Sequence, residues 1–281
     1  MTELLDHDAT SHVLDGDWPL HYHEHGTGPV LIMLHGSGPG VSGWSNFRGN
    51  LNVFAKEYRT IVLDMPGFGR SPQGSLDRRY PHVAADAVAT LMDRLDIPTA
   101  HFLGNSMGGV VVMQFALSHS ERADRLVLMG PGGINVIGPP VSEGWQRLDE
   151  FLAAPTREAM VAWVHTMVAD RSIVTDALID ERLKNALEPG VVESARAIFA
   201  SLSDPRFRDD PPVWALTHRI RHRTLITWGR DDRMVPFENG LLPWRRMPNA
   251  ELHVFSKCGH WAQVERKDDF ERVVLEFLSR P

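Results

Sequence analysis

Short apolar runs that alternate with helical patterns constrain the fold of this chain more than any other feature. Six runs have the near-continuous apolar character of strands that are covered on both faces: Val30–Leu34, Thr60–Leu63, His101–Leu103, Leu126–Met129, Thr224–Trp228 and Glu251–Phe255. Apolar residues at helical spacing occupy positions 83–95 and recur near the C-terminus at positions 270–278. This alternation predicts an α/β protein whose mostly parallel central sheet carries helices on both faces.

The alternation is interrupted between about Gly133 and Pro212, where helical periodicity continues but strand-like runs are few. Thr156 is typical of a helix N-cap, and an apolar helical stripe that includes Trp163 and Met167 follows it. We therefore expect a helical lid, residues 134–212, inserted into an α/β core that is formed by residues 1–133 and 213–281.

Composition excludes several classes of protein. The 281 residues suit one large domain with an insertion, and 29 Lys+Arg against 36 Asp+Glu give a net charge of −7. An acidic chain argues against a nucleic-acid partner, because phosphate neutralisation needs a basic surface. One cysteine, Cys258, excludes an intramolecular disulfide. No apolar run approaches the roughly 18 residues of a membrane span, and the first ten residues lack the basic start of a secretory signal, so we expect a cytoplasmic protein without a membrane partner.

The most specific motif is Gly104-Asn105-Ser106-Met107-Gly108-Gly109. It lies between a strand-like run and an apolar helical run, which is the context of a nucleophile elbow, where flanking glycines leave room for a strained turn that projects a serine hydroxyl. The helix that follows also directs backbone N–H groups and its positive end toward developing negative charge. Ser106 is therefore the candidate nucleophile.

A serine nucleophile needs a base and an acid, and in this type of fold they follow it along the chain in the order acid, then histidine. His260 comes just after a predicted strand and is the candidate general base. Asp231 and Asp232 both follow another predicted strand, and spacing alone leaves open which of them orients the histidine.

A glycine-rich loop, His35-Gly36-Ser37-Gly38-Pro39-Gly40, directly follows the first of the six predicted strands. Such a loop lets backbone N–H groups approach a reacting oxygen and form an oxyanion hole, with the N–H of Met107 as the second donor. The loop lacks the Lys-Ser/Thr ending of a phosphate-binding loop, so phosphate binding is disfavoured.

Together these segments resemble the α/β-hydrolases, and more narrowly the meta-cleavage product hydrolases of bacterial aromatic-compound degradation. The matching segments span nearly the whole chain beyond the first 25 residues: His35–Gly40 with Trp44 and Asn46, Gly104–Gly109, Leu128–Gly133, Trp228–Arg233 and Cys258–Gln263. The G-x-S-x-G motif alone indicates only the superfamily, whereas Ser-Gly-Pro-Gly, Gly-Pro-Gly-Gly and Cys-Gly-His-Trp together are more specific.

The resemblance implies hydrolysis of a carbon–carbon bond in a 2-hydroxy-6-oxo-2,4-dienoate by a serine hydrolase that needs no cofactor or metal. It implies that Asp232 is the acid, that His260 is the base, and that the backbone N–H groups of Ser37 and Met107 form the oxyanion hole; some members have glycine where this chain has Ser37. The substrate-binding residues that it suggests are Asn46, Asn105, Trp261, the loop glycines Gly36 and Gly38, and Arg182 in the lid, which matches an arginine that meets the substrate carboxylate. It also suggests a homodimer or higher homo-oligomer.

Residue chemistry alone adds one substrate contact and leaves alternatives open. Met167 in the lid is a candidate for contact with the variable end of the substrate, since methionine adapts to irregular shapes. A carboxylesterase or lactonase could use the same three residues, and a receptor could use the fold without turnover. Dehalogenases and epoxide hydrolases need a carboxylate where Ser106 stands. His21, His23 and His25 alternate, and we expect an exposed sheet face there rather than a metal site.

Overall fold

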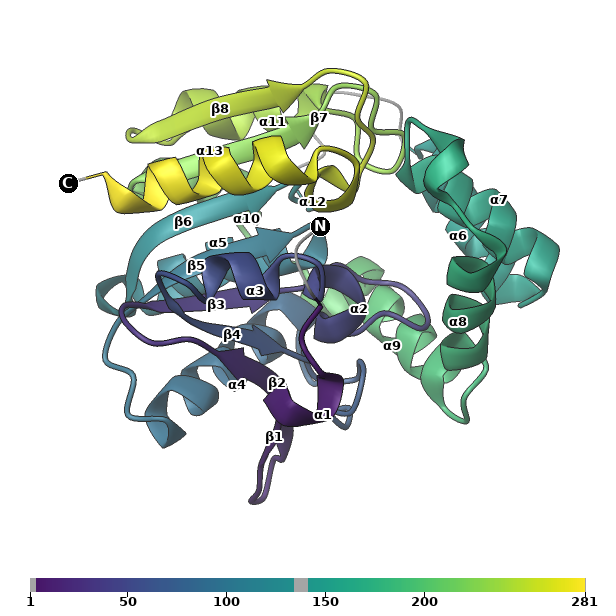
Figure 1. The fold of residues 1–281 in the computed structure, drawn as a ribbon, viewed down its shortest axis with the longest axis horizontal. Helices are drawn as coiled ribbons and strands as arrows, with labels where there is room; N and C mark the ends of the chain where they lie inside the picture. The colour runs from purple at the N-terminus through teal and green to yellow at the C-terminus, as the bar shows by residue number, and fades with distance from the viewer. Residues whose placement is uncertain (1–3, 134–140, 281) are drawn as a thin grey trace.

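The computed structural model describes residues 4–133 and 141–280, and its centre is an eight-stranded sheet with the order β1-β2-β4-β3-β5-β6-β7-β8 (Figure 1). β1 and β2 pair with each other, and β2 with β4, in antiparallel fashion, whereas the other neighbours are parallel. The six predicted strands are confirmed as β3 to β8. The strands are β1 (Ser11–Leu14), β2 (Leu20–His25), β3 (Val30–Leu34), β4 (Arg59–Leu63), β5 (Ala100–Asn105), β6 (Ala123–Met129), β7 (Thr224–Gly229) and β8 (Ala250–Phe255).

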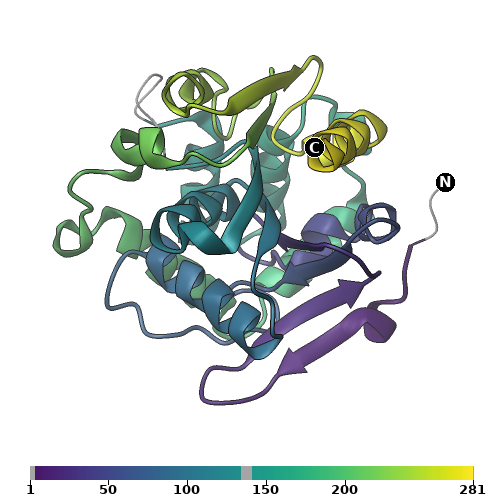
Figure 2. The same cartoon turned by 90° about the vertical axis from the view of Figure 1, so that its left-hand side faces the viewer.

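Helices cover both faces of the sheet, as the apolar strands require (Figure 2). Alternate side chains of one strand face opposite ways, so Ile32 and Leu34 of β3 pack in the cluster that contains α4 and α5 residues. Leu31 and Met33 pack in the cluster that contains α3 and α13 residues. The core helices are α1 (His7–Thr10), α2 (Gly43–Phe47), α3 (Leu51–Phe54), α4 (Tyr80–Arg94), α5 (Met107–Ser118), α10 (Val213–Leu216), α11 (Glu238–Arg246), α12 (Ala262–Glu265) and α13 (Lys267–Ser279).

Between β6 and β7 the described chain is helical, and α6, α7 and α8 lie beyond the carboxyl ends of the parallel strands (Figure 1). Thr156 caps α7, with its side chain accepting a hydrogen bond from the Ala159 N–H at 3.2 Å. The start of the predicted lid, at residue 134, lies outside the described residues. The lid helices are α6 (Glu143–Ala153), α7 (Arg157–Met167), α8 (Asp176–Ala186) and α9 (Val191–Ser203), and short 3₁₀ turns span Ser120–Arg122, Arg171–Ile173, Pro205–Phe207 and Thr217–Arg219.

None of the helices in the described ranges combines the length and the apolar character that a membrane crossing requires.

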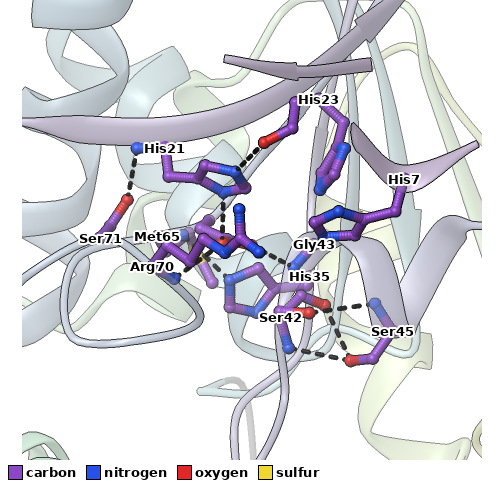
Figure 3. Close-up of polar contacts among 12 residues, drawn as sticks. His7, His21, His23, His35, Ser42, Gly43, Ser45, Met65, Arg70 and Ser71 are labelled. Atoms are coloured by element: carbon purple, nitrogen blue, oxygen red, sulfur yellow. Dashed lines mark hydrogen bonds and ion pairs between the residues drawn. The ribbon is translucent and has the colours of Figure 1, made fainter. Parts of the chain in front are cut away.

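The predicted exposed face of the alternating histidines is wrong for two of the three. His21 and His23 are 2% and 0% exposed, and only His25 at the end of β2 is exposed. The reason is that α1 and α2 cover this face: the His23 ring lies against His7 of α1 (Figure 3). It also lies against Trp44 of α2, with ring centroids 4.7 Å apart. In the described part of the chain, no three His, Cys, Asp or Glu side chains are arranged to hold a metal ion.

Candidate active site

Ser106 lies in the sharp turn between β5 and α5, with a backbone φ of +53° that non-glycine residues seldom adopt. Close backbone packing requires the glycines around it: a Cβ on Gly104 would lie 2.4 Å from the Gly108 carbonyl oxygen, and one on Gly108 would lie 2.2 Å from that of Leu34. The turn is held by the Ser106 N–H, which donates to the Met129 carbonyl at 2.8 Å. The strand–turn–helix context expected of a nucleophile elbow is therefore present.

Two backbone segments can supply N–H groups beside Ser106. Met107 is the first residue of α5, where a backbone N–H has no acceptor within the helix. Ser37 follows β3 and lines the same cavities as Ser106. The loop that carries Ser37 is joined to the elbow, because the Gly108 N–H donates to the His35 carbonyl at 3.1 Å. These positions suit an oxyanion hole.

The buried side chain of His35 holds this loop in place. The sequence motif includes His35, but it predicted no role for this residue. Its Nε2 accepts the Met65 N–H at 3.0 Å, so the proton lies on Nδ1, which donates to the Gly36 carbonyl at 2.5 Å. Burial lowers the pKa of His35 and keeps the ring neutral in this role. The signal in the sequence was its place directly after a strand, but nothing there indicated that its ring is buried.

A network around the buried carboxylate of Asp64 supports the same region. Figure 3 shows three residues of this network, His21, Gly43 and Arg70. Asp64 accepts hydrogen bonds from His21 Nδ1 at 2.7 Å, the Gly43 N–H at 2.6 Å and the Arg70 N–H at 2.9 Å. Burial acts to raise the pKa of Asp64, but the hydrogen bond from His21 and further favourable interactions, among them the hydrogen bond from the Arg70 N–H, together outweigh it, so that the pKa lies below its usual value. This network anchors the start of α2, the helix that carries Asn46.

His260 and Asp232 come together from the loops after β8 and β7. His260 Nδ1 lies 2.7 Å from Asp232 Oδ2, and the two side chains are 4% and 1% exposed. Asp232 Oδ1 accepts the backbone N–H groups of Met234 and Val235, each at 2.8 Å. Asp231, the alternative that the sequence left open, is exposed and lies 3.4 Å from Arg230. The geometry therefore gives His260 a buried carboxylate partner in Asp232.

Ser106 and His260 line one cavity, which we call the Arg182 cavity; it has a volume of about 90 Å³. In the described ranges no hydrogen bond joins the two side chains, and catalytic contacts of this kind often tighten only when substrate binds. Gly130 leaves room for the His260–Asp232 pair, because a Cβ there would lie 3.3 Å from the His260 ring and 3.4 Å from Asp232 Oδ2.

Arg182 of α8 is the cation of this cavity that stacks on aromatic rings. Its guanidinium carbon lies 4.7 Å from the Trp163 ring centre and 5.4 Å from that of Trp261. Its Nε is buried without a hydrogen-bond partner, and among the described residues no carboxylate pairs with it. Burial lowers its pKa to about 10, so it stays charged at neutral pH. A carboxylate ligand would satisfy this guanidinium.

The remaining predicted contacts divide into two groups. Gly36, Asn46, Asn105, Met167 and Trp261 all line the Arg182 cavity. Asn46 Oδ1 accepts the Gly36 N–H at 3.0 Å, which leaves its buried Nδ2 without a partner and able to donate to a ligand. Gly38 differs: it lines a neighbouring cavity, and a Cβ on it would lie 2.3 Å from the Trp163 ring, so its role is to let the lid approach the loop.

Glu265 of α12 is a positioning residue that the sequence did not indicate. Its Oε1 accepts the Gly259 N–H at 2.7 Å, and its Oε2 accepts the Ala169 N–H at 2.7 Å. It thereby joins the loop of His260 to the end of the lid helix α7. Burial raises its pKa. These contacts connect segments about 90 residues apart, and no local pattern predicts them.

Comparison with known proteins agrees with this geometry. The sequence pattern of the α/β-hydrolase fold matches residues 29–189. A 2-hydroxy-6-oxo-6-phenylhexa-2,4-dienoate hydrolase of Burkholderia cepacia is 38% identical over 99% of each chain. A 2-hydroxy-6-oxononadienedioate/2-hydroxy-6-oxononatrienedioate hydrolase of Burkholderia vietnamiensis is 42% identical over 93% of this chain and 91% of its own. The solved meta-cleavage product hydrolase of Pseudomonas fluorescens is 35% identical with a TM-score of 0.85, over 95% of this chain and 96% of its own. The chain therefore belongs to the α/β-hydrolase family and, within it, to the meta-cleavage product hydrolases.

Proposed function

We propose that this protein hydrolyses the carbon–carbon bond beside the C6 ketone of a 2-hydroxy-6-oxo-2,4-dienoate, a product of meta ring fission of aromatic compounds. The observation that carries the proposal is the guanidinium of Arg182. It lies against two indole rings, has no carboxylate partner among the described residues, and lines the same cavity as Ser106 and His260. A neutral ester carries no charge that could pair with this cation, whereas the C1 carboxylate of a dienoate can form an ion pair with it. The names of the curated relatives support the same chemistry.

Binding and proton transfer prepare the bond for cleavage. With the C1 carboxylate at Arg182, the C6 carbonyl reaches Ser106. Asp232 accepts from Nδ1–H of His260, which leaves Nε2 free to carry protons. The dienol proton moves from the C2 hydroxyl to C5 by way of His260, so that the substrate becomes its keto tautomer. This step is needed because carbon leaves readily only as a stabilised enolate.

Cleavage then follows the pattern of acyl transfer. Ser106 Oγ bonds to C6 while its proton passes to His260, and the negative charge on the C6 oxygen faces the N–H groups of Ser37 and Met107. The C5–C6 bond breaks, its electron pair remains on C5 as an enolate conjugated with the C2 ketone, and the enolate takes up the proton. Water, deprotonated by His260, releases the C6 fragment as a carboxylic acid and restores Ser106.

A panel of coloured ring-fission products tests the proposal, since cleavage removes their visible absorbance. We expect at least one dienoate to be bleached with formation of the acid product. Ser106→Ala should bind the same dienoate, but its turnover should be slower by a factor of about 10⁴ or more. Ser120→Ala, at a residue outside the cavity, should match the wild type. Bleaching of no dienoate, or undiminished turnover by Ser106→Ala, would contradict the proposal.

Arg182 separates this activity from that of a carboxylesterase or lactonase. Arg182→Gln should lower kcat/KM for the dienoate about 100-fold, because a buried charged hydrogen bond is lost, and should change hydrolysis of a neutral p-nitrophenyl ester less than threefold. Arg171→Gln, in the exposed lid turn, is the matched control. An equal loss on both substrates, or faster turnover of esters than of any dienoate, would favour the esterase alternative.

We also propose that the protein acts in the cytoplasm as a homodimer or larger homo-oligomer. Support comes from the edge strand β8 and the neighbouring α11, which expose Val254, Leu241 and Trp244 by 36%, 36% and 41%. Exposed apolar side chains on an edge strand and on the helix beside it are typical of contacts between subunits. Light scattering should give at least twice the mass of one chain, and a monomer at micromolar concentration would contradict this.

A further inference from the structure

A second cavity meets the Arg182 cavity at the nucleophile, and the roles proposed above leave it unassigned. Ser37 and Ser106 line both. The second cavity runs from Ser106 between α5 and the lid helices α6 and α9; we call it the Trp145 cavity. A ketone carbon held at Ser106 Oγ therefore has one substituent in each cavity. If the proposed function holds and the C1 carboxylate lies at Arg182, the group on C6 lies in the Trp145 cavity. Met167 lines the Arg182 cavity, so on this inference it contacts the dienoate and not, as the sequence suggested, the variable end of the substrate.

The Trp145 cavity has space for a large apolar group. Its volume is about 380 Å³, whereas an apolar protein cavity of about 150 Å³ already binds benzene. Met107 and Val110 of α5 and Trp145, Phe199 and Leu202 of the lid form its apolar walls. The Trp145 and Phe199 rings meet edge to face, with centroids 5.3 Å apart and planes at 82°. A further aromatic ring packs favourably beside such a pair.

Charged side chains at the rim of the Trp145 cavity oppose an anion. Arg79 is the one lysine or arginine among the described residues that line it, and its Nη1 is already bonded to Asp209 at 2.8 Å. Asp209 lines the cavity too, and Asp149 adds a second carboxylate. The described charged side chains that line the cavity are therefore one guanidinium, which is already paired, and two carboxylates. A carboxylate at the end of a C6 chain would meet repulsion that Arg79 does not offset.

The N-terminus of α4 does not provide a substitute for a free cation. Arg79 is the N-cap of α4, and His82 lies in its first turn. The two oxygens of Asp209 lie 2.8 Å from Arg79 Nη1 and 2.8 Å from His82 Nε2, so Asp209 takes the place where the helix end would favour an anion. A substrate carboxylate would have to displace it.

We propose that this protein selects ring-fission products whose C6 group is uncharged and aromatic or similarly bulky, and discriminates against C6 chains that end in a carboxylate. Asp209 is the residue that sets this discrimination, by neutralising Arg79. The names of the curated relatives include both kinds of substrate, a 6-phenyl dienoate and a nonadienedioate. The Trp145 cavity of this chain favours the first kind.

Steady-state kinetics on 2-hydroxy-6-oxo-6-phenylhexa-2,4-dienoate and 2-hydroxy-6-oxononadienedioate test the inference. We expect kcat/KM for the phenyl substrate to exceed that for the dioate at least tenfold. Equal values, or a preference for the dioate, would overturn the inference while leaving carbon–carbon hydrolysis intact. Turnover of neither substrate would overturn this inference, whereas the proposed function fails only if no dienoate of the wider panel is bleached.

Variants test the assigned cause. Asp209→Asn should free Arg79 and lower the phenyl-to-dioate ratio of kcat/KM at least fivefold. Asp149→Asn should lower the same ratio without breaking the Arg79–Asp209 pair, which keeps a test available if Asp209→Asn does not fold. Asp210→Asn, next along the chain but outside the cavity lining, should leave the ratio unchanged. An unchanged ratio in both cavity variants would overturn the role of these carboxylates.

Discussion

Both oxygens of Asp232 are engaged, and this fixes the tautomer of His260. Oδ1 holds two backbone N–H groups and Oδ2 faces His260 Nδ1. In Asp232→Asn the side chain would have an NH₂ group at one of these positions, opposite a donor. We expect kcat for the dienoate to fall about 10⁴-fold, as a change from carboxylate to amide does in a serine protease triad. Asp231→Asn, on the exposed neighbour, should change kcat less than twofold, and equal losses in both variants would contradict the assignment.

Single residues also show where sequence reasoning stops. Ser106 and His260 could be named because each lies shortly after a predicted strand, within a short and specific motif. The choice between Asp231 and Asp232 depends on how one turn orients two adjacent side chains, and spacing carries no information on that; only the family resemblance favoured Asp232. Glu265 could not be named at all, because the role depends on its contact with Ala169, which lies 96 residues away in the sequence.

His23 gives the stability of the protein a defined dependence on pH. Burial, helped by repulsion from His21 and His7, lowers its pKa to about 4. In the unfolded chain a histidine binds its proton near pH 6.5, so between pH 6.5 and 4 the unfolded state binds more protons than the folded state. The free energy of unfolding therefore falls as the pH falls through this window, by about 3 kcal/mol from this residue.

Urea unfolding at pH 7 and at pH 4 measures this contribution. His23→Gln should lose less stability than the wild type between the two pH values, by about 2–3 kcal/mol. His25→Gln, on the same strand but exposed, should lose as much as the wild type. The same loss in all three proteins would show that His23 titrates normally in the folded state.

At the scale of elements, the turn from β5 to α5 combines a strained serine with glycines that cannot be enlarged. A Cβ on Gly108 would lie 2.2 Å and 2.7 Å from the carbonyl oxygens of Leu34 and His35, and backbone atoms cannot move aside cheaply. We expect Gly108→Ala to lower stability by about 3 kcal/mol, which is about 6–12 °C in Tm. Gly132→Ala meets only Val110 at 3.7 Å and should shift Tm by about 2 °C or less. Calorimetry measures the two Tm values, and similar Tm shifts in both variants would contradict the steric argument.

The lid shows what helical periodicity does and does not predict. Thr156 and the apolar stripe after it predicted the start of α7, because capping and periodicity are local. The side chains that reach the active site depend on how α7 and α8 dock on the core. Trp163 fills the space above Gly38 and stacks on Arg182, although it read only as part of the apolar stripe.

For the whole molecule, apolar runs and the intervening helical patterns were sufficient to predict a parallel α/β sheet, since strands covered on both faces must be apolar throughout. The antiparallel addition of β1 and β2 was not predictable in the same way. Both strands are partly polar. β2 is placed in the sheet by its pairing with β4, about 35 residues further along the chain, and β1 is placed by its pairing with β2. The burial of His21 and His23 follows from that placement, which is why their alternation suggested an exposed face.

The contacts that hold the lid to the core differ in strength between α7 and α8. We therefore expect a Glu→Gln substitution to have different effects at these two places. At the end of α7, the His260 N–H donates to the Met167 carbonyl at 2.7 Å and Glu265 accepts the Ala169 N–H, so this end of the lid is tied to the loop of the proposed base. At α8, the tie is an ion pair between Glu181 and Arg48, whose side chains are 43% and 35% exposed. Exposed pairs contribute about 1 kcal/mol or less, whereas the Gly259 N–H that Glu265 accepts is partly buried, and a buried donor that loses its acceptor costs about 1–3 kcal/mol. Glu265→Gln should therefore lower Tm by several degrees and kcat about tenfold, because His260 loses its support. Glu181→Gln, which removes the same charge, should change Tm by about 2 °C or less and leave kcat for a 6-phenyl dienoate within twofold. Equal responses of Tm and kcat in the two variants would show that the lid is held equally firmly at both ends.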